Sequence, residues 1–391
     1  MIEGWVNAIA TKPEASPATA AFARRPARVP TAPALVASSL PLARFCEDES
    51  RVRAWRQLET AASLPIQSHA FASALASTLL AEAHIEVFSV GRGGDIAALL
   101  ALSRKPGYLE RWMTVGAHEV CEPDDALCRN PGSARLLAEA IVRDGRALEF
   151  DRIPAASPFI PALRSALRGK GWMSVRPATP TPTIALGPRW KDPESCFNSG
   201  RRSDFRRAAR RAGELGEPRF EILSPRPDAF DALFDEAVAV ELRSWKREAG
   251  TAIAADTAKE SCFRQYFRSA CEEGIFRIAF MRIDGRAVAM QMGLECLDRY
   301  WLFKIGFDER FERCSPGTLL MLHTLGWAAN RDLRAYELLG HFEPWIARFW
   351  TREHHECVWV RAYPYNPRGA AAFAADACAT QRRRLAPAGA R

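Results

Sequence analysis

Two blocks of the sequence, about residues 49–190 and 218–378, carry the periodicity of alternating helices and strands. In the first block, apolar residues spaced three and four apart predict helices over 51–62, 65–81, 132–144 and 157–169. Short apolar runs bounded by turn residues predict strands over 85–90, 95–103, 112–115, 147–152 and 172–177. This alternation predicts a first α/β domain.

The second block has the same character. Its periodicity predicts helices over 227–249, 257–273, 316–330 and 343–350. Its apolar runs predict strands over 218–222, 275–282, 286–294, 300–306, 334–339 and 354–363. Asp284-Gly285 between two strands is typical of a type I′ hairpin. The block therefore predicts a second α/β domain.

The stretch from Arg299 to Thr351 organises the second block, because it combines a buried strand, a polar loop and a sharp helix start. Ser315 as N-cap and Pro316 at the first helical position are helix-start signals. The free N–H groups of a helix N-terminus attract phosphates. A strand that splays from its neighbour at this point leaves a slot for an extended ligand, which fits a nucleotide-bearing acyl carrier such as coenzyme A.

The two blocks contain segments with the same order of elements. Residues 85–103 and 275–294 both consist of a strand, a Gly-containing turn and a return strand. We interpret them as two copies of one α/β unit. Since no Ser-Pro-Gly helix start is found in the first copy, we expect the cofactor in the second.

The central stretch resembles the GNAT-fold acetyltransferase family with a BioF2-like or CelD-like (cellulose biosynthesis) domain, distantly related to Fem-type aminoacyl transferases. The resemblance rests on Gly306-Phe307-Asp308, Ser315-Pro316-Gly317, Gly340, Glu343-Pro344-Trp345-Ile346 and Trp350. Two positions depart from the family pattern, because Trp345 replaces a Tyr and Ile346 replaces a Lys. If that Lys contacts ligand in relatives, its role here is missing or passes to Arg348.

The resemblance implies an α/β (α+β) fold of two tandem GNAT-like lobes, each a mixed, mostly antiparallel sheet flanked by helices. It implies an N-acyltransferase that moves an acyl group, above all acetyl, from acyl-CoA to an amine of a small-molecule, cell-envelope or polysaccharide-related acceptor. Two alternatives stay open. One is aminoacyl transfer from charged tRNA, as in Fem-type relatives, and the other is a non-catalytic accessory protein of exopolysaccharide or cellulose production.

Three sets of site residues follow from the resemblance. For the acyl-CoA we expect contacts from Lys304, Ile305, Gly306, Arg313, Ser315, Pro316, Gly317 and Thr318. For proton transfer we select His341, Glu343 and Tyr300. For the acceptor we select Glu241, Trp245, Asp308, Trp345 and Arg348.

Several of these residues could instead have a purely structural role. Glu343 could oppose a helix dipole, and His341 could be an ordinary loop residue. Tyr300 could be a core aromatic, and Asp308 could fix its own loop. No metal site is expected, because the adjacent His354 and His355 point to opposite faces of a strand.

The composition of the chain predicts a basic surface. The chain has 391 residues, 54 Lys and Arg against 46 Asp and Glu, and a formal net charge of +8. Six Arg fall within Arg201–Arg211, and Arg202, Arg206 and Arg210 share one helix face. This helix is either a solvated basic helix or a contact for a polyanion such as tRNA, lipid phosphate or the adenosine end of CoA.

The expected organisation has five parts. These are a flexible leader (1–48), an N-terminal lobe (49–190), a basic linker helix (191–217), a C-terminal acyl-CoA-binding lobe (218–378) and a basic tail (379–391). The extended Thr179–Thr183 segment marks the region of the lobe boundary. Ten Cys without a CxxC pair, and no apolar run near the ~20 residues of a membrane span, predict a cytoplasmic protein. The sequence predicts neither the acceptor nor an oligomeric state.

Overall fold

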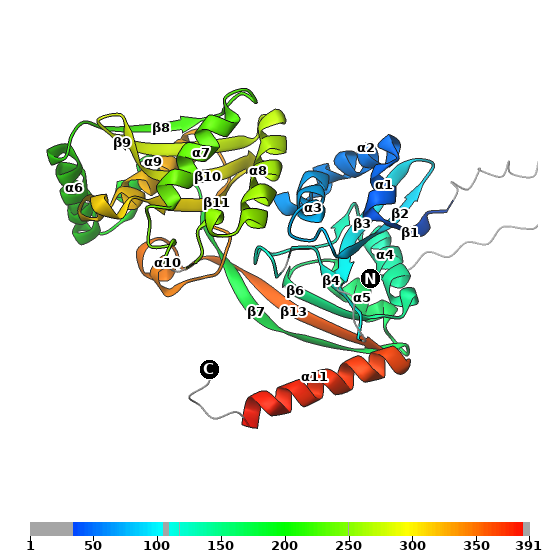
Figure 1. Cartoon of the computed structure of the whole chain (residues 1–391). Coiled ribbons are helices and arrows are strands. Elements are labelled where there is room, and N and C mark those ends of the chain that lie inside the picture. The colour runs from blue at the N-terminus through cyan, green and yellow to red at the C-terminus, as the bar shows by residue number, and fades with distance from the viewer. Residues whose placement is uncertain (1–33, 105–108, 117, 249, 386–391) are drawn as a thin grey trace, which may run out of the picture. The chain divides into compact units, whose positions relative to one another are not determined.

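The computed structural model describes residues 34–104, 109–116, 118–248 and 250–385 (Figure 1). Within them, thirteen strands form one mixed sheet. The strands are β1 (Val36–Pro41), β2 (His84–Arg92), β3 (Asp95–Arg104), β4 (Arg111–Thr114), β5 (Leu127–Cys128), β6 (Ala147–Pro154), β7 (Gly171–Ala185), β8 (Pro218–Leu223), β9 (Phe276–Ile283), β10 (Arg286–Cys296), β11 (Arg299–Phe307), β12 (Ala335–Glu337) and β13 (His354–Pro364).

Eleven α-helices flank this sheet in the described part of the chain. They are α1 (Leu42–Cys46), α2 (Glu49–Leu58), α3 (His69–Ala76), α4 (Pro131–Asp144), α5 (Phe159–Ala166), α6 (Ser199–Glu214), α7 (Phe230–Glu241), α8 (Thr257–Glu272), α9 (Pro316–Asn330), α10 (Pro344–Phe349) and α11 (Pro367–Leu385). We call β1–β7 with their helices the first lobe, and α6 to β13 the second lobe.

The sheet runs in the order β1-β2-β3-β4-β6-β13-β7-β12-β11-β10-β9-β8, and β5 pairs with β3. The pairs β4–β6 and β11–β12 are parallel, and the other pairs are antiparallel. Each lobe therefore repeats an antiparallel meander, a helix and a parallel strand. The predicted fold class, two tandem lobes of mixed and mostly antiparallel sheet flanked by helices, is confirmed.

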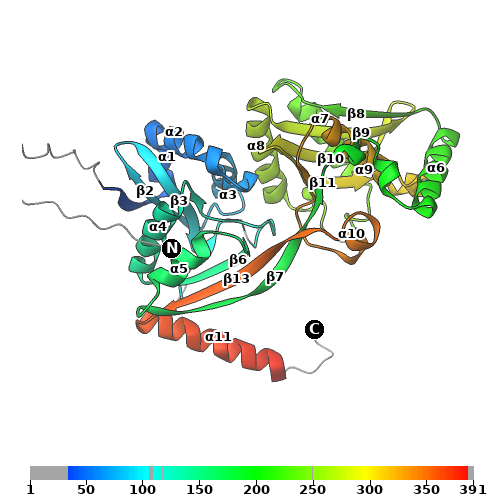
Figure 2. The ribbon, with the colours of Figure 1, turned by 180° about the vertical axis from the view of Figure 1, so that it is seen from behind.

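The two lobes exchange a strand. β13, from the end of the second lobe, lies between β6 and β7 of the first lobe. In return, β7 continues past its pairing with β13 and pairs with β12 through Thr183–Ala185. Figures 1 and 2 both show β7 and β13 running side by side as long strands. The Thr179–Thr183 segment is extended, as expected, but it is a shared strand and not a free linker.

The core of the second lobe has two faces because strand residues alternate in direction. Ile278 and Phe280 face α7 and α8, and they share one hydrophobic cluster with α2 and α3 of the first lobe. Ala279 and Met281 face the opposite side and pack against α6 and α9. The apolar runs predicted as strands are therefore buried on both faces.

Several predicted boundaries change in the structure, most clearly in the following segments. The helix over 65–81 divides at Ser68, whose hydroxyl accepts from the Phe71 N–H and begins α3. The helix over 227–249 ends at Glu241, whose carbonyl accepts from the Ser244 hydroxyl at 2.6 Å. Residues 36–46, placed in the flexible leader, form β1 and α1, and residues 379–385 of the tail belong to α11. The rest of the leader, residues 1–33, and residues 386–391 of the tail lie outside the described residues.

Gly306 on β11 gives a stability prediction, because a Cβ added there would lie 3.0 Å from Cα and 3.2 Å from Cβ of Glu241. We expect Gly306→Ala to push α7 away from β11 and to lower the free energy of unfolding by about 1–3 kcal/mol. Urea denaturation measures this. Gly213→Ala is the control, because Gly213 faces open space within a helix. Equal midpoints for the two variants would show that the close approach does not constrain position 306.

Within the described residues, no helix combines the length and the apolar character that a bilayer crossing requires. All ten cysteines are free thiols.

Candidate active site

The strand β11 separates from its parallel neighbour β12. The two pair only at Arg299–Trp301, whereas β11 continues to Phe307. Past Trp301, this edge of β11 has no paired strand in the described structure. The sequence-based expectation of a splayed strand beside the helix start therefore agrees with the observed pairing.

A bulge in β11 changes the direction of its side chains. The register with β10 shifts between Met292, opposite Lys304, and Gly293, opposite Leu302, so that Phe303 is the extra residue. Consecutive side chains then reach the same helix: the Phe303 ring lies 5.8 Å from that of Tyr266, and Lys304 Nζ lies 4.1 Å from the ring centre of Phe263. The bulge thus turns Lys304 toward α8.

The start of α9 is open. Ser315 is in the left-handed region, with φ 47° and ψ 55°, and its side chain makes no capping hydrogen bond. Ser315 occupies the N-cap position as predicted, but the side-chain hydrogen bond that a serine usually makes there is absent. Pro316 occupies the first helical position as predicted. At this start the Ser315 N–H donates to the Glu312 carbonyl at 2.8 Å, the Thr318 N–H donates to the Ser315 carbonyl at 3.0 Å, and Pro316 has no N–H. The Gly317 N–H and the helix dipole are therefore what this start offers to an anion.

The first lobe has a related but closed helix start. The first copy has no Ser-Pro-Gly start, as expected, but Asn130-Pro131-Gly132 opens α4 between the parallel strands β4 and β6. Here Asn130 Oδ1 accepts from the Ser133 N–H at 2.9 Å, and the Ser133 hydroxyl donates to the Asn130 carbonyl at 2.8 Å. The helix caps itself. The start of α9 in the second lobe has no side-chain cap, so it is more accessible to an anion than the start of α4.

Lys304, on the splayed edge of β11, interacts electrostatically with Glu122 of the first lobe. Lys304 is half-buried, and burial lowers its pKa to about 8, against the opposing effect of Glu122. Burial raises the pKa of Glu122, while the nearby Lys304, the hydrogen bond from the Gly340 N–H and Arg152 act in the other direction. Titratable groups with perturbed pKa values in one cluster are characteristic of reactive sites.

Glu122 and Arg152 were not predicted from the sequence. Glu122 accepts from the Gly340 N–H at 3.1 Å, and Arg152 donates to the carbonyls of Gly340 and Cys121. Both side chains are buried, and both come from the first lobe. Together they fix the chain on either side of Gly340, directly before His341. A run of acidic residues such as the one around Glu122 is typical of an exposed loop. The sequence therefore does not indicate that Glu122 is buried.

The predicted residues after β12 lie in the loop before α10 and in α10 itself. His341, Glu343, Trp345 and Arg348 are all exposed, and Glu343 occupies the N-cap position of α10. The Glu343 N–H donates to the His341 carbonyl at 2.9 Å. His341 and Glu343 are therefore joined through the backbone of one short segment before α10. Ile346 is buried, so the position where relatives have Lys faces the core here.

Two of the remaining predicted residues, Tyr300 and Glu241, are buried in the core. Tyr300 is fully buried and stacks on Tyr336 with ring centres 4.8 Å apart, which supports the core reading over a catalytic one. Glu241 is also fully buried, and its carboxylate accepts from Lys246 Nζ at 2.9 Å and from the Ile253 N–H at 2.8 Å. Lys246 also donates to the Ile305 carbonyl at 2.6 Å. The buried Tyr300 and Glu241 give no support for direct contact with a ligand.

Asp308 and Trp245 differ from those two. Asp308 is buried and accepts from three arginines, so it fixes the loop between β11 and α9. Trp245 is 52% exposed and lies in the turns after α7.

Arginines cover the surface beside the α9 start. On α6, Phe205, Ala208 and Ala212 are buried, and Arg206, Arg207, Arg210 and Arg211 are exposed. The Arg211 guanidinium donates to the Arg313 carbonyl at 3.1 Å, which joins α6 to the 3-10 segment Glu309–Cys314. The basic helix predicted over 201–211 therefore adjoins the loop that precedes α9.

Burial of two further acids beside Glu122 gives a pH prediction. Burial raises the pKa of Asp125 to about 7, although its carboxylate accepts from the Ser157 hydroxyl at 2.6 Å. The folded state thus binds this proton more tightly than the unfolded chain does. Stability should fall as pH rises from about 4 to about 7, by up to about 4 kcal/mol from this group at 1.36 kcal/mol per pKa unit. Burial also raises the pKa of Asp124.

The variant Asp125→Asn keeps the acceptor oxygen and removes the titration. Urea denaturation between pH 5 and pH 8 should show a smaller loss of stability for this variant than for the wild type. Asp332→Asn is the control, because the Asp332 side chain is 82% exposed. An unchanged pH dependence in Asp125→Asn would contradict the account of this buried carboxyl.

Comparisons with known proteins agree with this geometry. Residues 199–346 match the family model described as an acetyltransferase (GNAT) domain. The structure of FemX is similar with a TM-score of 0.54 at 9% identity, covering 79% of this chain and 95% of FemX. The C-terminal domain of a candidate lysylphosphatidylglycerol synthetase from Agrobacterium fabrum is similar with a TM-score of 0.50 at 14% identity, covering 84% and 95% of the two chains. A comparison with curated proteins gave no significant sequence match.

Identities this low show a shared fold alone. A tandem GNAT protein from the clavulanic acid biosynthesis pathway also aligns, at a TM-score of 0.45 and 13% identity over 85% of this chain and 99% of that chain. The matched segment runs from the first residue of α6 into α10, and so contains β11, the α9 start and β12. The second lobe is therefore similar to a GNAT domain over these residues. The narrower resemblance to BioF2-like and CelD-like proteins stays a prediction.

Proposed function

We propose that the protein is an N-acyltransferase that moves an acyl group from acyl-CoA to an amine. The observation that carries the proposal is the unpaired edge of β11 beside the uncapped start of α9. A pantetheine arm is an extended chain with amide groups, which suits the edge of a strand. A pyrophosphate is an anion, which suits the helix start.

Placing acyl-CoA along the β11 edge assigns individual residues to its parts. We assign the backbone of Lys304–Gly306 to the pantetheine arm and Ser315–Thr318 to the pyrophosphate. Arg313 is exposed and forms no ion pair among the described residues, so its guanidinium is available to a phosphate. Lys246 already donates to the Ile305 carbonyl, so a bound arm would displace this contact or share it.

In the reaction, the amine nitrogen attacks the thioester carbonyl carbon. The C–N bond forms, the C–S bond breaks, and coenzyme A leaves as a thiolate that takes up a proton. We assign removal of the amine proton to His341, with Glu343 beside it on the same turn. Lys304 is a second group for proton transfer, because its lowered pKa keeps a fraction of it neutral near pH 8. Trp245, Trp345 and Arg348 are exposed side chains available to the acceptor.

A second candidate function is aminoacyl transfer from charged tRNA. The exposed arginines of α6 and the joined loop before α9 favour it, because they extend a basic surface beyond the length of a CoA pyrophosphate. Binding through such a surface should weaken steeply as salt rises. A third candidate, an accessory protein without catalysis, is favoured by Ile346, which is buried where relatives carry Lys.

Release of free CoA thiol from acetyl-CoA in the presence of amines tests the proposal. We expect release that requires both an amine and the protein. His341→Ala should lower kcat by about a hundredfold with little change in the KM for acetyl-CoA. Arg352→Ala, an exposed position on the following loop, is the control. Binding of acetyl-CoA without thiol release from any amine would favour the accessory role.

A further inference from the structure

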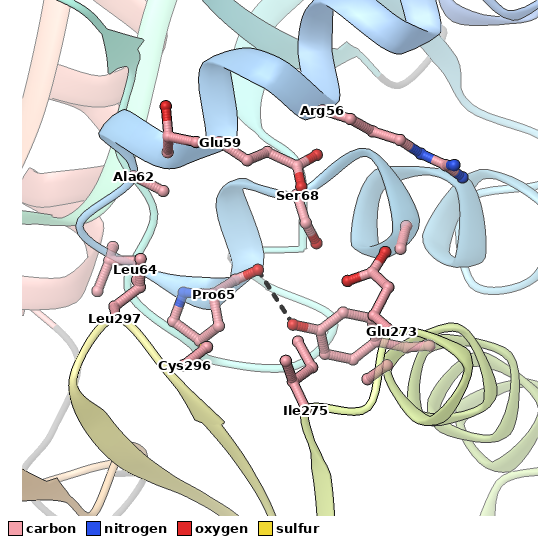
Figure 3. A pocket seen from close by; sticks show the side chains of 14 residues that line it. Arg56, Glu59, Ala62, Leu64, Pro65, Ser68, Glu273, Ile275, Cys296 and Leu297 are labelled. Carbon is pink, nitrogen blue, oxygen red and sulfur yellow. Dashed lines mark hydrogen bonds between the residues drawn. The ribbon is translucent and has the colours of Figure 1, made fainter. Parts of the chain in front are cut away.

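A cavity of about 270 Å³ lies apart from the splayed edge of β11. It is enclosed by the first-lobe segment from α2 to α3 on one side, and by α8 and the β10–β11 turn on the other (Figure 3). The Tyr266 hydroxyl of α8 donates to the Pro65 carbonyl at 3.0 Å across this boundary. The two sides are thus joined directly at the cavity wall.

The walls of the cavity are mainly apolar. They consist of Ala62, Leu64, Pro65, Ala70, Tyr266, Ala270, Ile275 and Leu297 with Cys296. Three charged side chains, Arg56, Glu59 and Glu273, also line it. In Figure 3 the carboxylates of Glu59 and Glu273 point toward the same part of the cavity, near Ser68. A ligand there would meet an apolar surface with acidic groups at one end.

The charges in the cavity do not cancel. One Glu59 oxygen accepts from the His69 N–H at 2.8 Å, but Glu59, Glu273 and Arg56 form no ion pair with any described residue. Burial raises the pKa of Glu59 to about 7 and also raises the pKa of Glu273, and the nearby Arg56 opposes this only in part. One guanidinium offsets only one of the two carboxylates. Above pH 7 the two carboxylates therefore outnumber the single guanidinium. Glu59 is half-buried, where an unmatched charge is unfavourable, whereas Glu273 and Arg56 are exposed.

We propose that this cavity binds a small organic cation, namely a protonated primary amine on an apolar stem of a few methylene groups. The ammonium would pair with Glu59 and Glu273, and the stem would lie against Leu64, Ile275 and Leu297. An anionic ligand is disfavoured, because it would face two carboxylates and only one arginine. This site goes beyond acyl transfer and does not depend on it, since no residue of the cavity belongs to the β11 edge or to the α9 start.

Three probes with one stem separate charge from apolar contact: n-pentylammonium, 1-pentanol and pentanoate. Their dissociation constants are measured on the full chain at pH 8 by isothermal titration calorimetry, without acyl-CoA. We expect pentylammonium to bind at least about tenfold more tightly than pentanol, which is about 1.4 kcal/mol. Pentanoate should bind most weakly.

Two variants and one control make the test specific. Glu59→Gln keeps the acceptor for the His69 N–H and should remove the preference for the ammonium over the alcohol. Ala70→Phe should fill the cavity and weaken both probes. Glu272→Gln removes an exposed neighbour outside the cavity and should change neither. Equal affinity for the three probes, tighter binding of pentanoate, or an unchanged preference in Glu59→Gln would each overturn the proposal, whether or not the protein transfers acyl groups.

Discussion

Replacing Gly317 by Trp is expected to weaken acyl-CoA binding by at least about a hundredfold, or about 2.7 kcal/mol. Gly317 is the second residue of α9, and a Cβ there would lie 3.5 Å from Cδ1 of Phe307, the last residue of β11. An indole at this position would occupy the space between the strand edge and the helix start. It would also cover the amides that we assign to the pyrophosphate.

The substitution should leave the fold intact. Gly317 has no positive φ, and the Cβ contact with Phe307 is an ordinary van der Waals distance. Calorimetric titration with acetyl-CoA measures the loss, and circular dichroism confirms the fold. Gly213→Trp is the matched control, because Gly213 also lies in a helix but faces open space. Wild-type affinity in a folded Gly317→Trp variant would place the donor elsewhere.

Replacing Asp308 by Ala is expected to lower the free energy of unfolding by about 3 kcal/mol. The Asp308 carboxylate accepts from Arg243 Nε at 2.9 Å, from Arg286 at 3.2 Å and from Arg310 Nε at 2.9 Å. It also accepts from the Arg310 N–H and so caps the 3-10 segment Glu309–Cys314. Without it, three guanidinium groups lose their shared partner. The arginines are partly exposed and regain water, which limits the loss.

This change should also reach the proposed donor site, because the capped segment leads directly into the α9 start. We therefore expect weaker acetyl-CoA binding together with a lower urea midpoint. Asp332→Asn is the control, since Asn tolerates the positive φ of 56° at this position and the change affects one exposed ion pair, with Lys191 at 3.0 Å, so it should cost less than about 0.5 kcal/mol. Equal urea midpoints for the two variants would show that the Asp308 cluster does not hold this loop.

Local patterns predicted most elements of the second lobe. Pro316 begins α9 and Asp284-Gly285 forms the hairpin turn with positive φ at both residues, as expected, because these signals depend on neighbours in sequence. The left-handed conformation of Ser315 was not predicted. A serine before proline is usually extended, and the αL state here is set by the preceding 3-10 segment, through the Ser315 N–H bond to the Glu312 carbonyl at 2.8 Å.

The parts of the candidate site that come from the first lobe could not be predicted. Glu122 contacts Gly340, which is 218 residues later in the chain, and Arg152 reaches the same residue from β6. The exchange of β7 and β13 between the lobes is likewise a long-range pairing without a local pattern. Such contacts depend on the assembled sheet, whereas periodicity reports only which face of an element is buried.

The thermal stability of the purified protein with and without acetyl-CoA, longer acyl-CoAs and free CoA tests the central proposal most directly. If the β11 edge and the α9 start hold the donor, ligand at about 100 times its dissociation constant should stabilise the protein by roughly 2.7 kcal/mol. The melting temperature should then rise by several degrees, and the rise should vanish in Gly317→Trp. No shift with any CoA species in a folded sample would contradict the acyl-CoA assignment and would favour the tRNA-dependent or accessory function.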